Sequence, residues 1–213
     1  MNSGRRKAWL FTTHSPREIF SSISAIGPGD LIVAVDGGLE RIDGLGLAPS
    51  VVIGDFDSLD PRLLEKYPLV TQLRHPTAKN ETDTELAVLW ALEQEVGELV
   101  ICNDFGGRID HALGLVQNLA LSHSRGLCAA AESEDQRIFF LDRETRLEGH
   151  EGCLLSLLAW GGTARFAASG GLLYSLDGLE LSSLRSRGIS NRIDSPQAWI
   201  RLSSGLALAI LTK

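Results

Sequence analysis

The stretch DLIVAVDGG, residues 30–38, decides the fold of this chain. Its apolar run Leu31–Val35 predicts a buried strand, and the two glycines after Asp36 predict a tight turn. A short helical pattern, LERIDGLGL (residues 39–47), and a second apolar run, SVVIGDFDS (residues 50–58), follow directly. Strand, helix and strand in this order predict two parallel strands joined by a crossover helix.

The same alternation extends in both directions. Upstream, KAWLF (residues 7–11) predicts a strand and SPREIFSSISAI (residues 15–26) a helix. Downstream, ELVICND (residues 98–104) and LCAAA (residues 127–131) predict two more short apolar strands. Short apolar strands that alternate with helices indicate a parallel sheet covered on both faces.

Two longer helices are predicted between these strands. The first, residues 82–97, has Thr82 as N-cap and Glu85 at the capping-box position, and we expect Gly97 to end it. The second covers residues 108–126. Helical spacing predicts core faces made by Leu86, Leu89 and Trp90 in the first helix and by Leu113, Val116 and Ala120 in the second.

After about Asp135 the pattern changes to short runs separated by Gly, Asp and Ser, which predicts about six antiparallel strands, one of them GLLYSL (residues 171–176). In the last pair we expect Ala198, Ile200 and Leu202 on one face, a turn at residues 203–205, and Leu206, Leu208 and Ile210 continuing that face. The predicted fold class is α/β, with an N-terminal Rossmann-like parallel-sheet domain (1–135) and a smaller antiparallel β domain (136–213).

Composition excludes several classes of protein. The 213 residues carry a net charge of −7 with a pI of about 5.2, so no broad basic surface is expected to bind nucleic acid. The three cysteines form no C-x-x-C motif, as expected of thiols in a reducing compartment. No apolar run reaches the roughly 18 residues of a membrane span. We therefore expect a cytoplasmic protein.

Asp55 and Asp57 follow a predicted strand with one residue between them. If the chain stays extended there, both carboxylates point the same way while Phe56 points into the core. Two such carboxylates repel unless a cation lies between them, and oxygen ligands suit Mg²⁺. The alternative is a solvated turn at residues 58–61.

The stretch HPTAKNETDTE, residues 75–85, brings a lysine and a threonine to the start of a predicted helix. Lys79, Thr82 and the free backbone amides would form a phosphate pocket, with Asp83 completing the metal shell. The alternative for Asp83 is a helix-start residue that interacts with the macrodipole.

In FGGRIDHALG, residues 105–114, two glycines would let the backbone approach a phosphate closely. Arg108 supplies a planar fork for phosphate oxygens, and Asp110 and His111 open the helix.

Taken together and in order, these motifs resemble those of thiamine pyrophosphokinases of the bacterial type. The resemblance rests on VAVDGG, GDFDSLD, HPTAKNETDTELA, FGGRIDHALGLVQNL, GLLYSL and SRGISN (residues 186–191). It implies that the C-terminal domain is a β-sandwich, that the protein is a homodimer, and that thiamine binds between subunits. It also implies transfer of the pyrophosphoryl group of ATP to the hydroxyethyl group of thiamine, giving thiamine diphosphate and AMP.

The resemblance also implies roles for individual residues. Asp55, Asp57 and Asp83 would hold Mg²⁺, and Asp36 would lie in the same pocket. Phosphate or nucleotide contacts would come from Lys79, Thr82, Arg108 and His111, while Asp110 would lie near the acceptor as a possible base. From the β domain, Ser190 and Asn191 would reach the ligand. Two features depart from the family pattern: TTHSP (residues 12–16) replaces a more glycine-like loop, and NRIDSPQA (residues 191–198) lacks an aromatic residue to stack on the thiamine pyrimidine. Tyr174 is a candidate for that contact, and the alternative is a core residue of a strand.

Other activities stay open at this point. Pyrophosphate transfer to another alcohol, such as a hydroxymethyl pterin, would use the same chemistry. An aspartyl-phosphate phosphatase would use Asp55 as nucleophile. A nucleotide sensor would bind ATP and Mg²⁺ without forming AMP.

Overall fold

The computed structural model describes residues 6–16, 23–57 and 59–213. The chain divides into two compact units, Met1–Glu134 and Asp135–Lys213. Within the described residues, no helix is long and apolar enough to cross a membrane.

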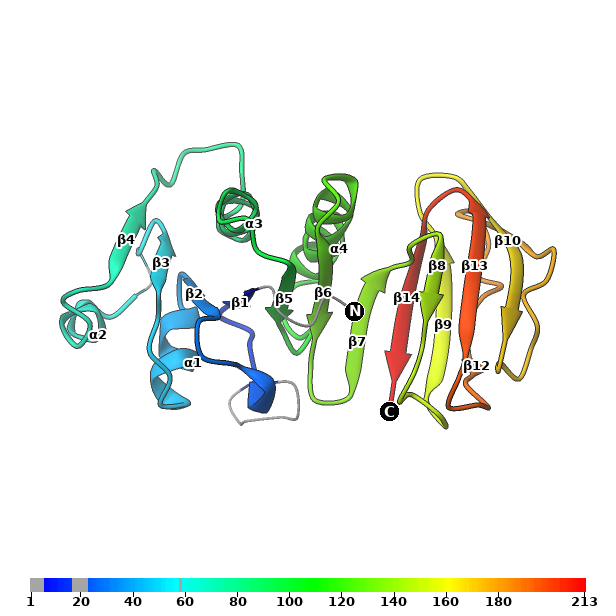
Figure 1. Ribbon diagram of the computed structural model, residues 1–213. Helices are drawn as coiled ribbons and strands as arrows, with labels where there is room; N and C mark the ends of the chain where they lie inside the picture. The colour runs from blue at the N-terminus through cyan, green and yellow to red at the C-terminus, as the bar shows by residue number, and fades with distance from the viewer. Residues whose placement is uncertain (1–5, 17–22, 58) are drawn as a thin grey trace. The chain divides into compact units, whose positions relative to one another are not determined.

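In the described residues of unit 1, six parallel strands lie in the spatial order β6, β5, β1, β2, β3, β4 (Figure 1). The strands pair in phase, so that Leu10 of β1 lies opposite Val33 on one side and Ile101 on the other. This sheet confirms the predicted parallel α/β architecture. The strand bounds are β1 Lys7–Phe11, β2 Leu31–Val35, β3 Val51–Gly54, β4 Thr71–Arg74, β5 Glu98–Cys102 and β6 Cys128–Glu132.

Helices cover the sheet on both faces, because the central strands are apolar on both. Helix α1 (Gly38–Gly44) lies on one side, and α3 (Asp83–Glu93) and α4 (Ile109–Ser124) lie on the other (Figure 1). The α1 side buries Trp9 and Phe11 against Leu39 and Ile42. The described residues of this unit also form two short helical segments, the 3₁₀ turn η1 (Ile23–Ala25) and α2 (Pro61–Glu65). Of the helix expected over residues 15–26, residues 17–22 lie outside the described part.

Helix α3 begins where expected, but it ends earlier than predicted and buries a different face. Thr82 is the N-cap, and its Oγ1 accepts a hydrogen bond from Glu85 N at 3.1 Å. The helix ends at Glu93, before the left-handed residue Glu95 (φ 53°), so Gly97 is not its stop. The face expected from Leu86, Leu89 and Trp90 is only half-buried. The fully buried residues are Ala87, Val88 and Ala91, because α3 packs closely on β2 and β3 through small side chains.

The predicted core face of α4 is also wrong. Leu113 is 54% exposed, and the face of α4 toward the protein interior is made by Leu115, Leu119 and two polar residues, Asn118 and Ser122. Leu113 is therefore on the exposed side of the helix, while Val116 and Ala120 are half-buried and none of the three belongs to its buried face. Because the buried face of α4 includes the polar residues Asn118 and Ser122, the spacing of apolar residues alone did not identify that face.

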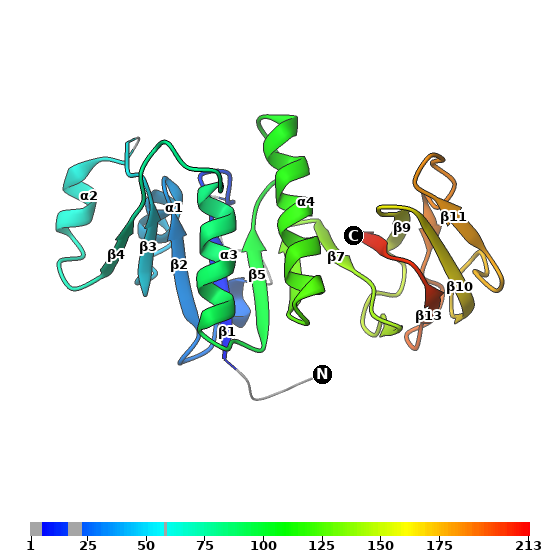
Figure 2. The ribbon, with the colours of Figure 1, turned by 90° about the horizontal axis from the view of Figure 1, so that it is seen from above.

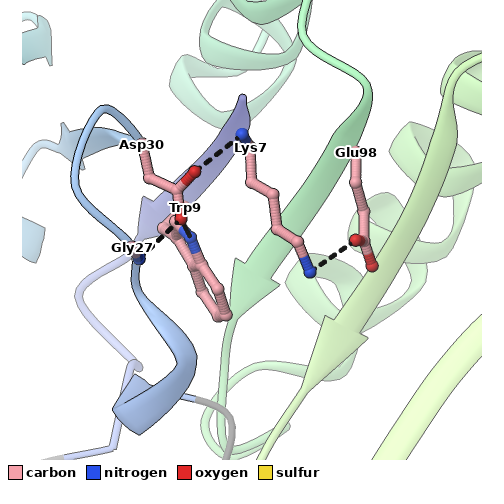
Figure 3. Close-up of polar contacts among 5 residues, drawn as sticks. All are labelled: Lys7, Trp9, Gly27, Asp30 and Glu98. Atoms are coloured by element: carbon pink, nitrogen blue, oxygen red, sulfur yellow. Dashed lines mark hydrogen bonds and ion pairs between the residues drawn. The ribbon is translucent and has the colours of Figure 1, made fainter. Parts of the chain in front are cut away.

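At the amino ends of β1 and β2, a polar network centres on Asp30 (Figure 3). Its carboxylate accepts three hydrogen bonds, from Lys7 N (2.9 Å), Gly27 N (2.9 Å) and Trp9 Nε1 (3.0 Å). Although burial acts in the opposite direction, these donors and the Lys7 charge hold the pKa of Asp30 below its usual value. Lys7 Nζ also pairs with Glu98 Oε2 of β5 at 2.6 Å.

Unit 2 is a β-sandwich, which confirms the predicted antiparallel second domain. One sheet has the order β12, β9, β14, β7 and the other β11, β10, β13, β8. Side chains from both sheets, such as Leu157 of β9 and Phe166 of β10, share one core. The bounds are β7 Gln136–Phe140, β8 Glu144–Arg146, β9 Leu154–Ala159, β10 Thr163–Gly170, β11 Glu180–Ser182, β12 Asn191–Arg192, β13 Trp199–Ser204 and β14 Ala207–Thr212.

Two details of the second domain were predicted wrongly. Ala198, Ile200 and Leu202 are buried as expected, and the chain turns at Gly205 (φ 83°), but β13 and β14 lie in different sheets. Because the chain crosses between the sheets, the sandwich core takes Ala207, Ala209 and Leu211 instead of Leu206, Leu208 and Ile210. GLLYSL is not a strand and contributes only a single bridge, Leu172 to Ile193.

Candidate functional site

Three strands of unit 1 are followed by a non-glycine residue with a positive φ angle. Asp36 (φ 46°), Phe56 (φ 65°) and Phe105 (φ 56°) follow β2, β3 and β5, and all three are in the left-handed region that side-chain-bearing residues rarely adopt. Such conformations persist where the surrounding structure imposes them, often at functional sites. They lie at the carboxyl edge of a parallel sheet, which is where ligands bind in this class of fold.

Asp36 lies directly against Gly54. Its backbone N donates to Ile53 O at 3.0 Å, and a Cβ atom added to Gly54 would lie only 1.7 Å from Asp36 Oδ1. That oxygen is buried and accepts no hydrogen bond in the described structure. A buried carboxylate oxygen without a partner has a large desolvation cost, which a cation would offset.

The pKa of Asp36 reflects this environment. Burial, followed by repulsion from Asp83 and Asp55, raises it to about 7, against a smaller opposing effect of Lys79. The raised pKa of Asp36 thus indicates that several carboxylates lie close together in a site that is partly shielded from water.

Asp55 and Asp57 are neighbours, but not for the reason expected. The chain is not extended at Phe56. It turns there, Phe56 packs into the core under the Arg74 guanidinium (4.9 Å from its ring centroid), and Asp57 N donates to Asp55 Oδ1 at 3.1 Å. This backbone bond, helped by Thr77, the Asp57 side chain and Lys79, lowers the pKa of Asp55. Asp55 is therefore an ionised carboxylate with the exposed Asp57 beside it.

Lys79 is the cation among these carboxylates. Its Nζ lies 2.9 Å from Asp83 Oδ1 and donates to Pro76 O at 3.1 Å, and its side chain is only 12% exposed. Burial acts to lower the pKa of Lys79, but Asp83, Asp55 and Asp36 together raise it. We call Asp36, Asp55, Asp57, Lys79 and Asp83 the carboxylate cluster.

The carboxylate cluster has too little positive charge for its carboxylates. In residues 6–16, 23–57 and 59–213, no three Asp, Glu, His or Cys side chains are already arranged around a common metal position. The unpartnered oxygen of Asp36 and its raised pKa nevertheless show negative charge that Lys79 alone does not balance. Oxygen donors of this kind fit a hard divalent cation.

The third predicted group, at the start of α4, is exposed. Arg108 Nε and Nη2 both hydrogen bond to the Asp110 carboxylate, the first at 3.1 Å, and the two side chains are 74% and 58% exposed. The Arg108 guanidinium lowers the pKa of Asp110, and His111 N also donates to Asp110 Oδ1. The described contacts do not join this pair to the carboxylate cluster.

Sequence reasoning undervalued the loop after β1. His14 O accepts from Asp104 N at 2.8 Å, and a Cβ atom on Gly107 would lie 2.7 Å from the His14 ring. Arg41 donates twice to Thr13 O, at 3.0 and 2.9 Å. Since β1 is central in the sheet, its carboxyl end had to adjoin the loops after β2 and β5. His14 thus lies against the glycine pair that precedes Arg108.

In unit 2, Asn191 is occupied by the backbone. Its side chain accepts from Tyr174 N (3.0 Å) and Arg192 N (2.8 Å) and donates to Tyr174 O (2.8 Å), and it is 6% exposed. Tyr174 itself is 64% exposed, so it is not a core residue. Ser190 is left-handed (φ 60°), and its N donates to Ser156 Oγ at 3.1 Å. Asn191 therefore holds Tyr174 in place.

Comparison with known proteins connects this site to one family. Residues 25–128 match the family model described as thiamin pyrophosphokinase, catalytic domain. Thiamine pyrophosphokinase of Bacillus subtilis is 36% identical over 92 residues, 42% of this chain and 42% of that protein. Thiamin pyrophosphokinase 1 of Caenorhabditis elegans is 25% identical over 179 residues, 76% of this chain and 70% of that protein.

The crystal structure of thiamine pyrophosphokinase from Bacillus subtilis has the same fold. Its TM-score is 0.86 at 20% identity, over 98% of this chain and 99% of that one. The resemblance inferred from the motifs and the predicted fold class are both confirmed.

Proposed function

We propose that this chain, which resembles the thiamine pyrophosphokinases in sequence and in fold, transfers the pyrophosphoryl group of ATP to thiamine. The hydroxyethyl oxygen of thiamine would bond to the β-phosphorus of ATP, the bond from that phosphorus to the α,β-bridging oxygen would break, and AMP would leave. The hydroxyl proton would pass to a base or to solvent. The carboxylate cluster, within the stretch that matches the family's catalytic domain, is the observation that carries this proposal.

The residues present fit Mg²⁺. Asp55, Asp57 and Asp83 would hold it, with Asp36 beside them, because Lys79 is the one cation among the described residues that pairs with Asp83 and acts on the pKa values of Asp36 and Asp55. When bound, the ion would neutralise charge on the phosphate oxygens. Lys79 is held by Asp83 in the present arrangement and would be released toward a phosphate as that charge is shared.

The phosphate-binding role extends to the helix starts. Thr82 caps α3 through Oγ1, which places its backbone amide and those after it at the positive end of the helix. Arg108 and His111 lie at the start of α4, and His14 lies against the loop before it. We propose that these groups position the triphosphate, since positioning and charge neutralisation account for most of the catalysis of phosphoryl transfer.

Asp110 is proposed to lie near the thiamine hydroxyl. Its pKa is lowered by Arg108, which makes it a weak base but keeps it ionised. Orientation of the alcohol by the Arg108–Asp110 pair is therefore as important as proton removal in this proposal.

For the thiamine ring we propose Tyr174 as the aromatic contact, with Ser190 and Asn191 beside it. Asn191 acts here through Tyr174, because its own amide is satisfied by backbone. We also propose a homodimer in which thiamine lies between subunits. Mixing a Tyr174→Ala chain with an Asp55→Asn chain tests this: partial recovery of activity in the mixture supports a shared site.

A reducing, cytoplasmic location is proposed as well, since Cys102, Cys128 and Cys153 form no disulfide.

The direct test is to incubate the chain with ATP, Mg²⁺ and thiamine and to identify the products. Thiamine diphosphate and AMP in equal amounts support the proposal, whereas ADP or inorganic phosphate as the sole product rejects it. Asp43→Asn is a matched control, because Asp43 bonds Lys66 and Tyr67 and takes no part in the carboxylate cluster.

A further inference from the structure

A cavity in unit 1 lies between the start of α3 and the middle of α4. Its volume is about 220 Å³. The two helices run side by side in both views (Figures 1 and 2), and they are in contact. A cavity of about 150 Å³ holds benzene, so this one has room for a substituted six-membered ring. The residues that line it are Thr82, Glu85, Gly114, Gln117, Asn118 and Leu121.

Asn118 is the unusual member of this lining. It is 5% exposed, and its backbone O accepts a hydrogen bond from Ser122 Oγ at 2.9 Å. Its side-chain amide makes no hydrogen bond to any described residue. The amide is not among the fully buried side-chain groups without a partner, so solvent in the cavity reaches it, and its donor and acceptor atoms are open to a ligand that replaces this water.

The other groups around the cavity define what such a ligand must offer. The amides of Gln117 and Asn118 each provide one acceptor oxygen and two donor hydrogens, and Glu85 provides a carboxylate. Leu121 provides an apolar surface, and Gly114 leaves open space, since a Cβ atom there would meet nothing within 4 Å. This is a small cavity for a flat ring with adjacent donor and acceptor atoms.

An amide side chain can form two parallel hydrogen bonds with an amino group and a nearby ring nitrogen, as Asn does with N6 and N7 of adenine, and the same donor and acceptor pair fits the amino group and adjacent ring nitrogen of an aminopyrimidine. ATP carries such an edge on its adenine and thiamine carries one on its aminopyrimidine. We infer that the α3–α4 cavity binds an aminopyrimidine edge, with Asn118 as the residue that recognises it.

This inference rests on the proposed function for its choice of ring. It also agrees with the position of the cavity: Thr82 lines it, and Asp83, the next residue, belongs to the carboxylate cluster. A ring held there would lie next to the site proposed for the phosphates.

The test compares each substrate with its oxo analogue. ITP has an oxo group where ATP has its amino group, and the 4-oxo analogue of thiamine differs from thiamine in the same way. The ratio of kcat/KM for amino and oxo compounds is measured in wild type, Asn118→Leu and Asn118→Asp. We expect the ratio to fall about 10–100-fold for one of the two pairs and to stay constant for the other. A fall in the ATP ratio assigns the cavity to adenine, and a fall in the thiamine ratio assigns it to the acceptor.

Two further variants guard against loss of folding. Gly114→Val adds a side chain to the cavity one helical turn before Asn118 on the same wall, and it should raise KM for the same substrate by about tenfold. It should not lower the melting temperature, because glycine is a poor helix former. Ser122→Ala is the matched control on α4: it removes a buried hydroxyl outside the cavity and should leave both ratios unchanged.

The outcomes separate this inference from the proposed function. If wild type makes thiamine diphosphate but folded Asn118 and Gly114 variants keep both ratios and both KM values, the inference is overturned and the proposed function stands. If wild type makes none, the proposed function fails. The cavity is then judged by calorimetric titration with adenosine and with thiamine: tighter binding of either one to wild type than to Asn118→Leu supports the inference, and equal or absent binding overturns it.

Discussion

Two aspartates lie at the two ends of strand β2, Asp30 just before it and Asp36 just after it. Asp30 accepts hydrogen bonds from two backbone amides and the Trp9 indole, and its pKa is lowered. Asp36 has a buried oxygen with no partner in the described structure, and its pKa is raised to about 7. The same side chain is thus a fully satisfied structural group at one end of the strand and an uncompensated charge at the other.

The difference indicates that Asp30 contributes to the stability of the fold, whereas Asp36 belongs to a site that needs a ligand. Donors at the amino edge of the sheet are supplied by the fold itself, so Asp30 stabilises the chain without any ligand. At the carboxyl edge the fold gathers like charges, and among the described residues Lys79 is the cation that acts on the pKa values of Asp36 and Asp55. The positive charge that would neutralise the other carboxylates has to come from a bound ligand or cation.

The largest effect is expected for Asp55→Asn, which weakens the carboxyl edge alone. Mg²⁺-dependent formation of AMP should fall about 10²–10³-fold, because one ionised oxygen donor to the cation is lost. The melting temperature should stay within about 2 °C of wild type. Asp43→Asn is the control, and Mg²⁺-dependent turnover that survives in Asp55→Asn would contradict the proposed metal role.

Asp30→Asn tests the amino edge. The amide cannot accept all three hydrogen bonds of the carboxylate, so the free energy of unfolding should fall by about 2 kcal/mol. Because the folded pKa of Asp30 is lowered, its contribution is present above the unfolded pKa and is lost as pH falls through the folded pKa. Urea unfolding at pH 7 and below pH 3 measures this. Equal destabilisation at both pH values would exclude the charge as the cause.

Asp36→Asn should have the opposite sign. The folded pKa is about 7 and the ordinary pKa of an aspartate is 3.8, so the folded state holds more protons between these values and stability falls as pH rises through that range. Without divalent cations the variant should exceed wild type by about 1–2 kcal/mol at pH 8 and by nothing at pH 3. Added Mg²⁺ should reduce the gain at pH 8, and a gain that does not depend on pH would refute this explanation.

Asp110→Asn is expected to change activity modestly and stability not at all, because both partners of the Arg108–Asp110 pair are exposed. Turnover should fall about tenfold while KM for ATP stays within about twofold. Glu180→Gln, which breaks the exposed Arg165–Glu180 pair of unit 2, is the matched control. Near-normal turnover in Asp110→Asn would remove Asp110 from the acceptor site.

The parallel sheet was predictable because apolar runs and glycine turns repeat along the first 134 residues. The residues around Lys79 were predictable as a group for a related reason: the carboxyl ends of parallel strands share one edge. The extended Asp-Phe-Asp geometry was wrong, since burial of Phe56 forces a left-handed turn that no local pattern encodes.

Other failures have similar causes. The inner face of α4 contains Asn118 and Ser122, so hydrophobic spacing pointed to its outer face instead. The connection from β13 to β14 resembles a hairpin in sequence. A hairpin and a crossing between two sheets differ in which strands pair with each other, and the local sequence does not show this. Asn191 matches a binding motif, yet its contacts with the Tyr174 backbone depend on residues 17 positions away.

The contact between Asp36 and Gly54 has a consequence for how the chain can vary. A methyl group at position 54 would collide with the Asp36 carboxylate, and Gly54 also has φ of 153°, which residues with a side chain rarely adopt. Alanine there is therefore tolerable only if residue 36 shrinks or turns away and the backbone at position 54 shifts as well. In a library randomised at both positions, the two choices should depend on each other: glycine at 54 should be retained with aspartate at 36, and alanine should appear with glycine or serine. Residues 36 and 54 would thus change together and not independently of each other.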